Sequence, residues 1–302
     1  MKKIVIALGG NALMQKGQEE TKQTIVKNIQ KSVQQLTVLL DKYQVVLTFG
    51  NGPEVGLLLL QNEIAKSKIP QMPLDVLGAQ TQGYLGYLLE QQIMKVTSKP
   101  VITLVTQVLV DKKDKAFSHP TKPIGPYYTK VQRDKLKKQF PLVEQTGKGW
   151  RRVVASPTPL KVLPSKTISN LMKDHIVIAV GGGGIPVIKE KNKYLGVEAV
   201  IDKDLASAEL AKEIQADTLI ILTDVSYVYI NYKQVNQKEL KKVTLKQLHS
   251  YLEQGHFEQG SMLPKVKSAI NFLTLGGKQV IITSLNDISL ALQGKKGTII
   301  TP

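Results

Sequence analysis

The 302-residue chain contains no cysteine, which excludes disulfide bonds, thiolate metal ligands and a cysteine nucleophile. No two of its four histidines have the spacing of a helical zinc motif. We therefore expect no metal site built from protein side chains. No apolar stretch reaches the roughly 18 residues of a membrane span, and the first residues run directly into an expected strand. These absences favour a cytoplasmic protein without a membrane partner.

Arginine and aromatic residues are scarce, although the net charge is +17. Lysine supplies almost all of the positive charge, because the only arginines are Arg133, Arg151 and Arg152. Arginine is the preferred bidentate reader of phosphates and bases, and the lysines are spread along the chain rather than gathered in a tail. No helix-turn-helix, zinc-finger or RNA-binding signature occurs. We expect no specific nucleic-acid partner, whereas a basic surface would favour anionic substrates.

Three common enzyme signatures are also missing. The sequence has no GxGxxG dinucleotide fingerprint, no Walker GxxxxGK[ST] pattern and no GxSxG nucleophile elbow. These absences argue against a Rossmann dehydrogenase, a P-loop nucleotidase and an α/β-hydrolase.

Strand and helix patterns alternate along the chain. Ile25, Ile29, Val33, Leu36 and Leu40 fall on one face of a helix. We expect further helices near 54–65, 77–94, 164–172, 203–215, 244–253 and 264–275. Strands are expected at 4–8, 45–49, 101–110, 176–180, 185–189, 193–196, 218–223, 279–283 and 298–301. The pattern predicts an α/β fold in which helices cover both faces of a mostly parallel central sheet.

Residues 111–152, here called the protruding segment, interrupt this alternation. They contain four prolines, a lysine-rich run and a Gly-Lys-Gly turn. Long insertions in compact α/β domains are usually functional lids or flexible excursions. We therefore expect a protruding lid subdomain.

Two apolar runs each end in a glycine-rich turn that leads into a helical pattern. The first turn contains Gly9, Gly10 and Asn11, and the second contains Gly50, Asn51, Gly52 and Pro53. Glycine leaves no Cβ in the way, so backbone N–H groups can close on an oxyanion at the positive end of a helix. Open parallel sheets bind ligands at the carboxyl ends of their strands. The two turns therefore predict one site for a phosphate or a small anion.

Isolated lysines in restrained settings are the best candidates for chemistry. Lys122 lies between prolines and glycine, Lys203 lies between two acids, and Lys265 follows a turn of small residues. Each lysine could also be an ordinary solvated side chain near a helix start. Asp204 and Asp224 could organise a site or simply cap a helix or turn. Backbone-donor turns with lysines suit phosphoryl transfer, which needs mainly positioning and cations.

A third glycine-rich turn, 181–184, follows another apolar strand. It could be a flexible turn, but its position favours a close approach to a ligand or to backbone.

The ordered motifs resemble those of the carbamate kinases, within the amino acid kinase superfamily. The resemblance spans essentially the whole chain and rests on ALGGNA (7–12), GNGP (50–53), TKPIGP (121–126), GKGWR (147–151), GGGGIP (181–186), GVEAVIDKD (196–204) and GSMLPK (260–265). Any one turn would be weak evidence, whereas the ordered set is specific. Relatives that act on acetylglutamate, aspartate or UMP lack the TKPIGP-bearing excursion.

The resemblance implies a two-lobed homodimer that transfers a phosphoryl group reversibly between Mg²⁺-bound ATP and carbamate. Residues 1–205 would be the carbamate or carbamoyl phosphate lobe, including the lid, and residues 206–302 the nucleotide lobe. The implied substrate residues are Gly9, Gly10, Asn11, Gly50, Asn51 and Gly52. The implied phosphate-contacting residues are Lys122, Lys203 and Lys265, organised by Asp204. The implied nucleotide residues are Thr223, Asp224, Gly260, Ser261 and Met262. Mg²⁺ would come with the ATP or ADP phosphates.

Two positions depart from the pattern of the family, and a third differs from many relatives in the wider superfamily. Ala7 stands where many superfamily relatives have a lysine, and we expect Lys203 to supply the missing charge from another loop. Glu54 stands where glutamine is usual, and Ala155 where proline is usual. Glu54 could weaken anion binding, or it could point into its helix and favour the helix dipole, which we expect. The alternatives are another phosphotransferase of the superfamily and a nucleotide-binding regulatory protein without turnover.

Overall fold

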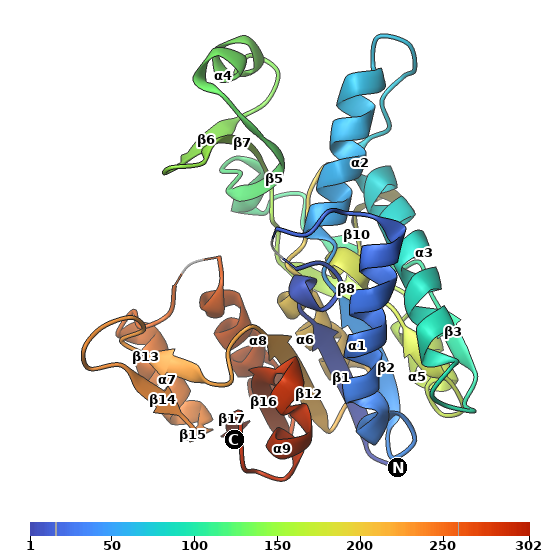
Figure 1. The fold of residues 1–302 in the computed structure, drawn as a ribbon, viewed down its shortest axis with the longest axis vertical. Helices are drawn as coiled ribbons and strands as arrows, with labels where there is room; N and C mark the ends of the chain where they lie inside the picture. The colour runs from blue at the N-terminus through green and yellow to red at the C-terminus, as the bar shows by residue number, and fades with distance from the viewer. Residues whose placement is uncertain (16, 259) are drawn as a thin grey trace.

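The computed structural model describes residues 1–15, 17–258 and 260–302, which form an α/β fold (Figure 1). Within these residues, eight strands make the central sheet in the order β15-β17-β16-β12-β1-β2-β9-β3. Neighbouring strands are parallel except in the antiparallel β16–β17 pair. The prediction of a mostly parallel sheet is confirmed. The strands are β1 (Lys3–Leu8), β2 (Gln44–Phe49), β3 (Val101–Thr103), β9 (Ile176–Ile178), β12 (Thr218–Thr223), β15 (Lys242–Thr244), β16 (Gln279–Ser284) and β17 (Thr298–Thr301).

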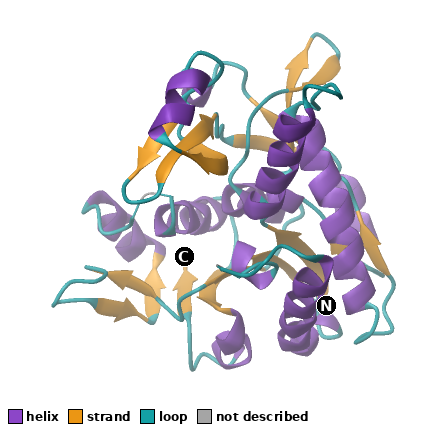
Figure 2. Ribbon diagram, turned by 45° about the horizontal axis from the view of Figure 1, so that its top comes forward, coloured by secondary structure: helices purple, strands orange, loops and turns teal. Residues whose placement is uncertain are grey.

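Helices cover both faces of the sheet (Figure 2). Alternate side chains of β1 enter different hydrophobic clusters, because successive residues of a strand point to opposite faces. One cluster joins the sheet to α1 (Lys22–Leu40), α3 (Leu74–Ile93) and α9 (Ile288–Leu292). The other joins it to α5 (Ser165–Leu171), α6 (Lys203–Glu213), α7 (Leu245–Glu253) and α8 (Met262–Thr274). Residues expected on the apolar face of α1 are all buried, which confirms that helix.

The expected strand 101–110 is wrong as a single element. Residues Val101–Thr103 form β3 at the edge of the main sheet, whereas β4 (Gln107–Val110) belongs to a second sheet. The chain changes sheet at Thr106, where the Gln82 side chain bonds to the Thr106 backbone: Oε1 accepts from its N–H at 2.7 Å, and Nε2 donates to its carbonyl at 3.2 Å. A side chain from α3 thus satisfies the backbone where the strand leaves the sheet.

Smaller sheets flank the central one. The second sheet has the order β11-β10-β4-β8, with β8 (Pro159–Val162), β10 (Ile185–Glu190) and β11 (Lys193–Gly196). The strands β10 and β11 confirm those expected at 185–189 and 193–196, and they pair antiparallel. A further pair near the C-terminal end of the chain consists of β13 (Val228–Ile230) and β14 (Lys238–Leu240).

Most of the protruding segment stands apart from the central sheet in Figure 1. It contributes β5 (Lys122–Tyr128), α4 (Lys130–Leu136), β6 (Leu142–Gln145) and β7 (Gly149–Val154), and the strands form an antiparallel sheet of order β5-β7-β6. Arg133 stacks on Trp150, Arg151 on Tyr127 and Arg152 on Phe140. The segment meets the body where Gly125 lies against Gly56 of α2 (Gly52–Ala65), since a Cβ on Gly56 would lie 3.4 Å from Gly125 Cα.

The expected boundary between lobes, at residues 205 and 206, lies inside α6. Strands from both sides of this boundary share the central sheet.

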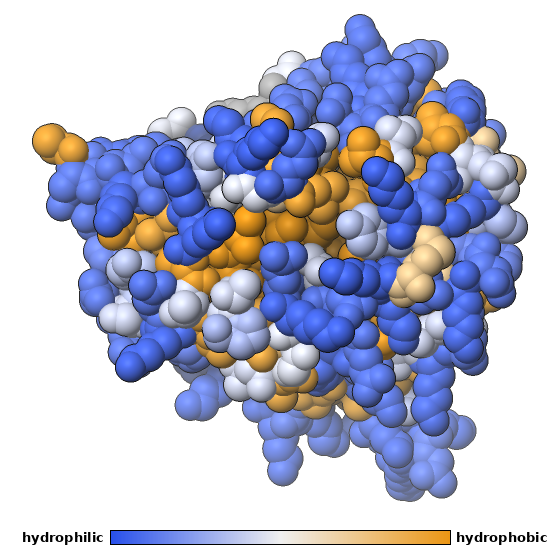
Figure 3. All heavy atoms as spheres, turned by 90° about the horizontal axis from the view of Figure 1, so that it is seen from below, coloured by the Kyte–Doolittle hydropathy of each residue, from blue (hydrophilic) through white to orange (hydrophobic). Residues whose placement is uncertain are grey.

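Hydrophilic residues cover most of the face shown in Figure 3, with apolar residues in a band across its middle. No helix among the described residues is long and apolar enough to cross a membrane.

Candidate active site

The first two glycine turns lie side by side. Their strands, β1 and β2, are parallel neighbours in which Leu8 pairs with Phe49, and Gly50 donates a backbone hydrogen bond to the Leu8 carbonyl at 3.3 Å. Gly10 opens a short 3-10 helix after β1. Because both turns follow the carboxyl ends of neighbouring strands, the structure brings them to the same edge of the sheet, as the sequence predicts.

The glycines of these turns allow close packing. A Cβ on Gly50 would lie 3.4 Å from the Lys203 side chain and 3.6 Å from the Gly10 nitrogen. A Cβ on Gly9 would lie 3.0 Å from the Leu222 carbonyl oxygen of β12. The aliphatic part of the Lys203 side chain therefore lies against the second turn, at Gly50. Ala7 is fully buried in β1 and carries no charge, and the expectation that Lys203 supplies this charge stays a prediction.

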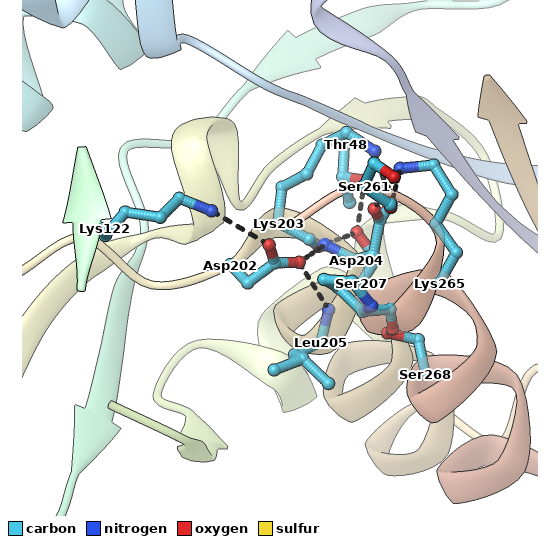
Figure 4. A network of polar contacts seen from close by, with 11 residues as sticks. Thr48, Lys122, Asp202, Lys203, Asp204, Leu205, Ser207, Ser261, Lys265 and Ser268 are labelled. Carbon is cyan, nitrogen blue, oxygen red and sulfur yellow. Dashed lines mark hydrogen bonds and ion pairs between the residues drawn. The ribbon is translucent and has the colours of Figure 1, made fainter. Parts of the chain in front are cut away.

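Asp204 is the centre of a buried ionic cluster (Figure 4). Lys203 donates to one carboxylate oxygen of Asp204, and Lys265 donates to the other at 3.0 Å. The exposed fractions of the side chains are 4% for Asp204, 12% for Lys203 and 15% for Lys265. Lys203 and Asp204 open α6, and Lys265 lies in the first turn of α8. Two helix starts thus converge on one carboxylate.

The charges of the cluster stabilise one another. Burial alone would raise the pKa of Asp204, but the adjacent ammonium groups of Lys203 and Lys265 lower it to about 2. Burial lowers the pKa of Lys203, and the Asp204 carboxylate opposes this effect. Burial also acts to lower the pKa of Lys265, but the attraction of the Asp204 carboxylate is stronger and raises this pKa above its ordinary value. The ionised carboxylate therefore holds two ammonium groups at the crevice.

Asp202 connects the protruding segment to the cluster. One of its carboxylate oxygens caps α6 by accepting from the Asp204 backbone N–H at 2.9 Å, and the other accepts from Lys122 Nζ at 3.0 Å. Lys122 is the first residue of β5. The structure thus places the three predicted lysines on neighbouring acids. Asp202 was missing from the predicted site, although its position before Lys203 is the signal that could have identified it.

Two buried hydroxyl groups support the cluster, and sequence reasoning missed both. Ser207 donates to the Lys203 carbonyl at 2.6 Å, so its Oγ accepts from Thr48 Oγ1, also at 2.6 Å. Thr48 belongs to β2 and Ser207 to α6. The contact ties the strand before the second glycine turn to the helix that carries Lys203.

A larger pocket adjoins the cluster on the C-terminal side. Its volume is about 770 Å³, and its lining includes Lys265 and the predicted nucleotide residues Thr223, Asp224, Ser261 and Met262. The aromatic side chains of Tyr229, Tyr232, His256 and Phe257 also line it. Gly260 has a positive φ of 78° beside this pocket's Ser261, which suits the turn before α8. Lys265 thus belongs both to this pocket and to the Asp204 cluster.

Glu54 departs from the role expected for it. It lies in the first turn of α2 but is only 2% exposed, and neither carboxylate oxygen has a hydrogen-bond partner among the described residues. Burial raises the pKa of Glu54 to about 7, outweighing the favourable backbone contact at the helix start. The expectation of a simple favourable helix-dipole contact is therefore wrong, because loss of hydration dominates.

Ala155 lies in a buried bridge to the segment that leads to α6. It pairs with Ala199, and its carbonyl accepts from the Val200 N–H at 2.9 Å. Ala155 therefore maintains a backbone contact between the end of β7 and the segment that leads to Lys203.

The arrangement combines backbone turns, three ammonium groups and a large adjoining pocket. Ammonium groups held on fixed carboxylates can stabilise the charge that spreads over a phosphoryl group during transfer. The model of the amino acid kinase family matches residues 2–284. The chain belongs to the amino acid kinase family.

Within this family, the chain is similar to several carbamate kinases over nearly its whole length. The carbamate kinase of Pyrococcus horikoshii is 46% identical, with 99% of each chain covered. Carbamate kinase 2 of Staphylococcus aureus is 48% identical, with 98% of each chain covered. Among solved structures, the carbamate kinase of Giardia lamblia bound to AMP-PNP superposes with a TM-score of 0.93 at 43% identity, covering 99% of this chain and 98% of that one.

Proposed function

We propose that this member of the amino acid kinase family catalyses reversible phosphoryl transfer between ATP and carbamate, and that it makes ATP from carbamoyl phosphate and ADP. The observation that carries the proposal is the Asp204 cluster, which holds Lys203 beside the second glycine turn, at Gly50, and Lys265 in the lining of the large pocket. A phosphoryl group passing between the turns and the pocket would meet both cations. The near-full-length similarity to carbamate kinases supports carbamate as the acceptor.

In this proposal the two halves of the site bind different reactants. Backbone N–H groups of Gly9 to Asn11 and Gly50 to Gly52 hold the acceptor anion, and the pocket lined by Thr223 and Asp224 holds the nucleotide. Residues 1–205 are then the acceptor lobe and 206–302 the nucleotide lobe. The protruding segment acts as a lid whose Lys122 approaches the anion. No general base is needed, because the carbamate oxygen is already anionic.

Mg²⁺ fits this site as a partner of the nucleotide. Mg²⁺ prefers oxygen ligands and commonly binds through substrate phosphates, one or two carboxylates and water. The described residues contain no cluster of three candidate metal ligands, and Asp224 offers a carboxylate in the nucleotide pocket. When bound, Mg²⁺ neutralises phosphate charge. We propose a cytoplasmic location because ATP and ADP are available there.

We further propose a homodimer that buries the outer face of α3. Val76, Tyr87 and Met94 are exposed along this face, and Gly83 has open space beside it. The neighbouring β3 is an edge strand of the central sheet. Apolar side chains beside an unpaired strand edge are typical of an interface. Sedimentation equilibrium would give twice the chain mass, and Tyr87→Glu would shift the protein toward the monomer.

The decisive experiment is ATP formation from carbamoyl phosphate, ADP and Mg²⁺, measured with a luciferase assay on the purified chain. We expect rapid ATP formation, and at least a 100-fold loss in Lys203→Met, because the Lys203 side chain lies beside the Gly50 turn and its ammonium group is held on Asp204. Lys212→Met is the matched control, since Lys212 lies on the same helix but pairs with Glu209.

Other outcomes separate the alternatives. ATP formation from a different acyl phosphate, but none from carbamoyl phosphate, would identify another phosphotransferase of the family. Tight ATP binding without any turnover, unaffected by Lys203→Met, would indicate a regulatory nucleotide-binding protein. Either result from folded protein would overturn the proposal.

A further inference from the structure

The side-chain amide of Asn51 is buried and hydrogen-bonded, although Asn51 lies in a turn. Asn51 lies between β2 and α2 and is 6% exposed. Its Nδ2 donates to Thr81 Oγ1 at 2.6 Å. Thr81 lies on α3, is completely buried, and donates its own proton to the Gly78 carbonyl at 2.7 Å. A residue on another helix therefore fixes a side chain of the second glycine turn.

The hydrogen bonds of Thr81 define which way the amide faces. A threonine hydroxyl has one proton, and here that proton goes to the helix carbonyl. Thr81 Oγ1 can then only accept from Asn51, so the nitrogen must face Thr81 and the oxygen must face away. The reversed amide would place two acceptor oxygens against each other, which is unfavourable in a buried site.

The 181–184 turn packs against the other side of the same carboxamide. A Cβ on Gly182 would lie 2.2 Å from Asn51 Nδ2 and 2.3 Å from its Oδ1. Gly182 also has a φ of 64°, and the preceding Val180 has a φ of 54°, which is rare for a β-branched residue. The strained turn leaves a space that the amide of Asn51 fills. This gives the third glycine turn a function beyond flexibility.

The space beside this amide is small. A cavity of about 20 Å³ lies between Asn51, Gly78, Gly181 and Gly182. The remaining Nδ2 proton and the Oδ1 atom of Asn51 are not used by Thr81. They are therefore available to a small planar anion with both donor and acceptor groups, such as carbamate.

We propose that Thr81 and Gly182 are positioning residues that orient the Asn51 carboxamide toward the acceptor. Thr81 accepts from the amide and Gly182 lets it lie flat against the third turn. This inference rests on the proposed function, since it assigns the amide to the acceptor side of that reaction.

The kinetic test compares Thr81→Val, which keeps the shape and removes the hydroxyl, with Thr81→Ser, which keeps the hydroxyl. We expect Thr81→Val to lower kcat/KM for carbamoyl phosphate by about 10- to 100-fold, because a small displacement of a positioning group has effects of this size. The KM for ADP stays unchanged, and Thr81→Ser restores most of the activity. A KM for ADP that rises as much as kcat/KM for carbamoyl phosphate falls, or no rescue by serine, would overturn the proposal.

A double variant separates positioning from general stability. If Thr81 acts through Asn51, Asn51→Ala combined with Thr81→Val is no less active than Asn51→Ala alone. Additive losses would mean that Thr81 acts independently, contrary to the proposal. Thermal unfolding of each variant identifies any loss of activity caused by misfolding.

A spectroscopic readout is independent of turnover. In protein labelled with ¹⁵N-asparagine, the Asn51 side-chain amide signals, assigned by their loss in Asn51→Asp, should shift in Thr81→Val and stay close to wild type in Thr81→Ser. If wild-type protein makes no ATP from carbamoyl phosphate but these shifts occur, the proposed function fails while the positioning of Asn51 stands. Unshifted signals in Thr81→Val would overturn the positioning itself.

Discussion

Asp204 and Glu54 are buried almost equally, with 3% and 2% of their surfaces exposed. Each also lies in the first turn of a helix, where the backbone favours a negative charge. Their pKa values nevertheless move in opposite directions, to about 2 for Asp204 and about 7 for Glu54. The difference is that Asp204 receives two lysine ammonium groups, whereas Glu54 has no hydrogen-bond partner among the described residues.

Ionic partners, rather than depth or helix position, therefore decide which buried carboxyl group stays charged in this protein. The paired carboxylate, Asp204, holds Lys203 beside the Gly50 turn and Lys265 in the lining of the large pocket, where the proposed reaction needs fixed charge. The unpaired one lies two residues beyond the Gly50–Gly52 turn, beside Glu20 and Tyr84 in a separate cavity of about 400 Å³. Comparing the two sites predicts different responses to substitution.

The largest effect is expected for Asp204→Asn, which keeps the size of the side chain and removes its charge. Lys203 and Lys265 would then be buried without a counter-charge, which destabilises proteins by about 3–5 kcal/mol. Activity should fall at least 100-fold, because both ammonium groups lose their fixed position. Urea unfolding and the ATP assay measure the two effects. Near-normal activity and stability in Asp204→Asn would contradict the comparison. The control is Asp174→Asn, an exposed substitution that should change neither activity nor stability.

Lys122→Met should affect activity much more than stability. Its ion pair with Asp202 is partly exposed, with 34% of the lysine side chain accessible, so it contributes less than about 1 kcal/mol to folding. Loss of the lid cation should lower kcat/KM for carbamoyl phosphate about 100-fold. Lys130→Met, an exposed substitution in the same segment, is the control. Equal losses in the two variants would show that Lys122 has no special position.

Glu54→Gln should stabilise the protein at alkaline pH. The folded-state pKa of about 7 lies above the ordinary value of 4.5, so the folded protein binds this proton more tightly than the unfolded chain. Wild-type stability therefore decreases as the pH rises from about 4.5 through 7, by about 3 kcal/mol in total for this group. Glutamine does not ionise, so Glu54→Gln avoids this decrease in stability. The gain over wild type should grow between these pH values and then level off.

Urea unfolding at pH 5, 6, 7 and 8 measures this difference. The exposed substitution Glu144→Gln should give a constant, small difference across the same range. A pH-independent gain in Glu54→Gln would mean that folding does not raise the pKa of this carboxyl group.

The smallest effect is expected for Thr48→Val, which removes the hydroxyl that donates to Ser207 and keeps the side-chain shape. The loss of one buried hydrogen bond should lower the free energy of unfolding by about 1 kcal/mol. Turnover should remain close to wild type, because Ser207 still bonds to the Lys203 carbonyl. Thr37→Val, on the surface of α1, is the control for unfolding. A large loss of turnover would show that Thr48 itself positions Lys203.

The sequence predicted those features that depend on local pattern. Apolar periodicity identified α1, and short apolar runs bounded by turns identified β12 and β17 with the observed bounds. The motif residues Lys122, Lys203, Asp204 and Lys265 proved to lie together, although their individual roles remain predictions.

Contacts between distant elements could not be predicted in this way. Thr48 is one polar residue in an apolar strand, and its partner Ser207 lies 159 positions away. Thr81 resembles any other polar residue of an amphipathic helix until α3 packs against the second turn. Glu54 has the sequence position of a favourable N-terminal acid, and only tertiary packing reveals its loss of hydration. These properties arise from packing, for which a single sequence carries no periodic signal.

The adjacency of β1 and β12 has a consequence for inhibitor design. The strands are hydrogen-bonded neighbours, so the turn at Gly9 and the nucleotide-side residue Thr223 follow strands about 4.8 Å apart. One continuous sheet fixes that separation. For the reaction proposed above, a compound that joins a nucleoside diphosphate to a carbamate mimic by a short, rigid linker would match this separation, and its affinity would benefit from linking.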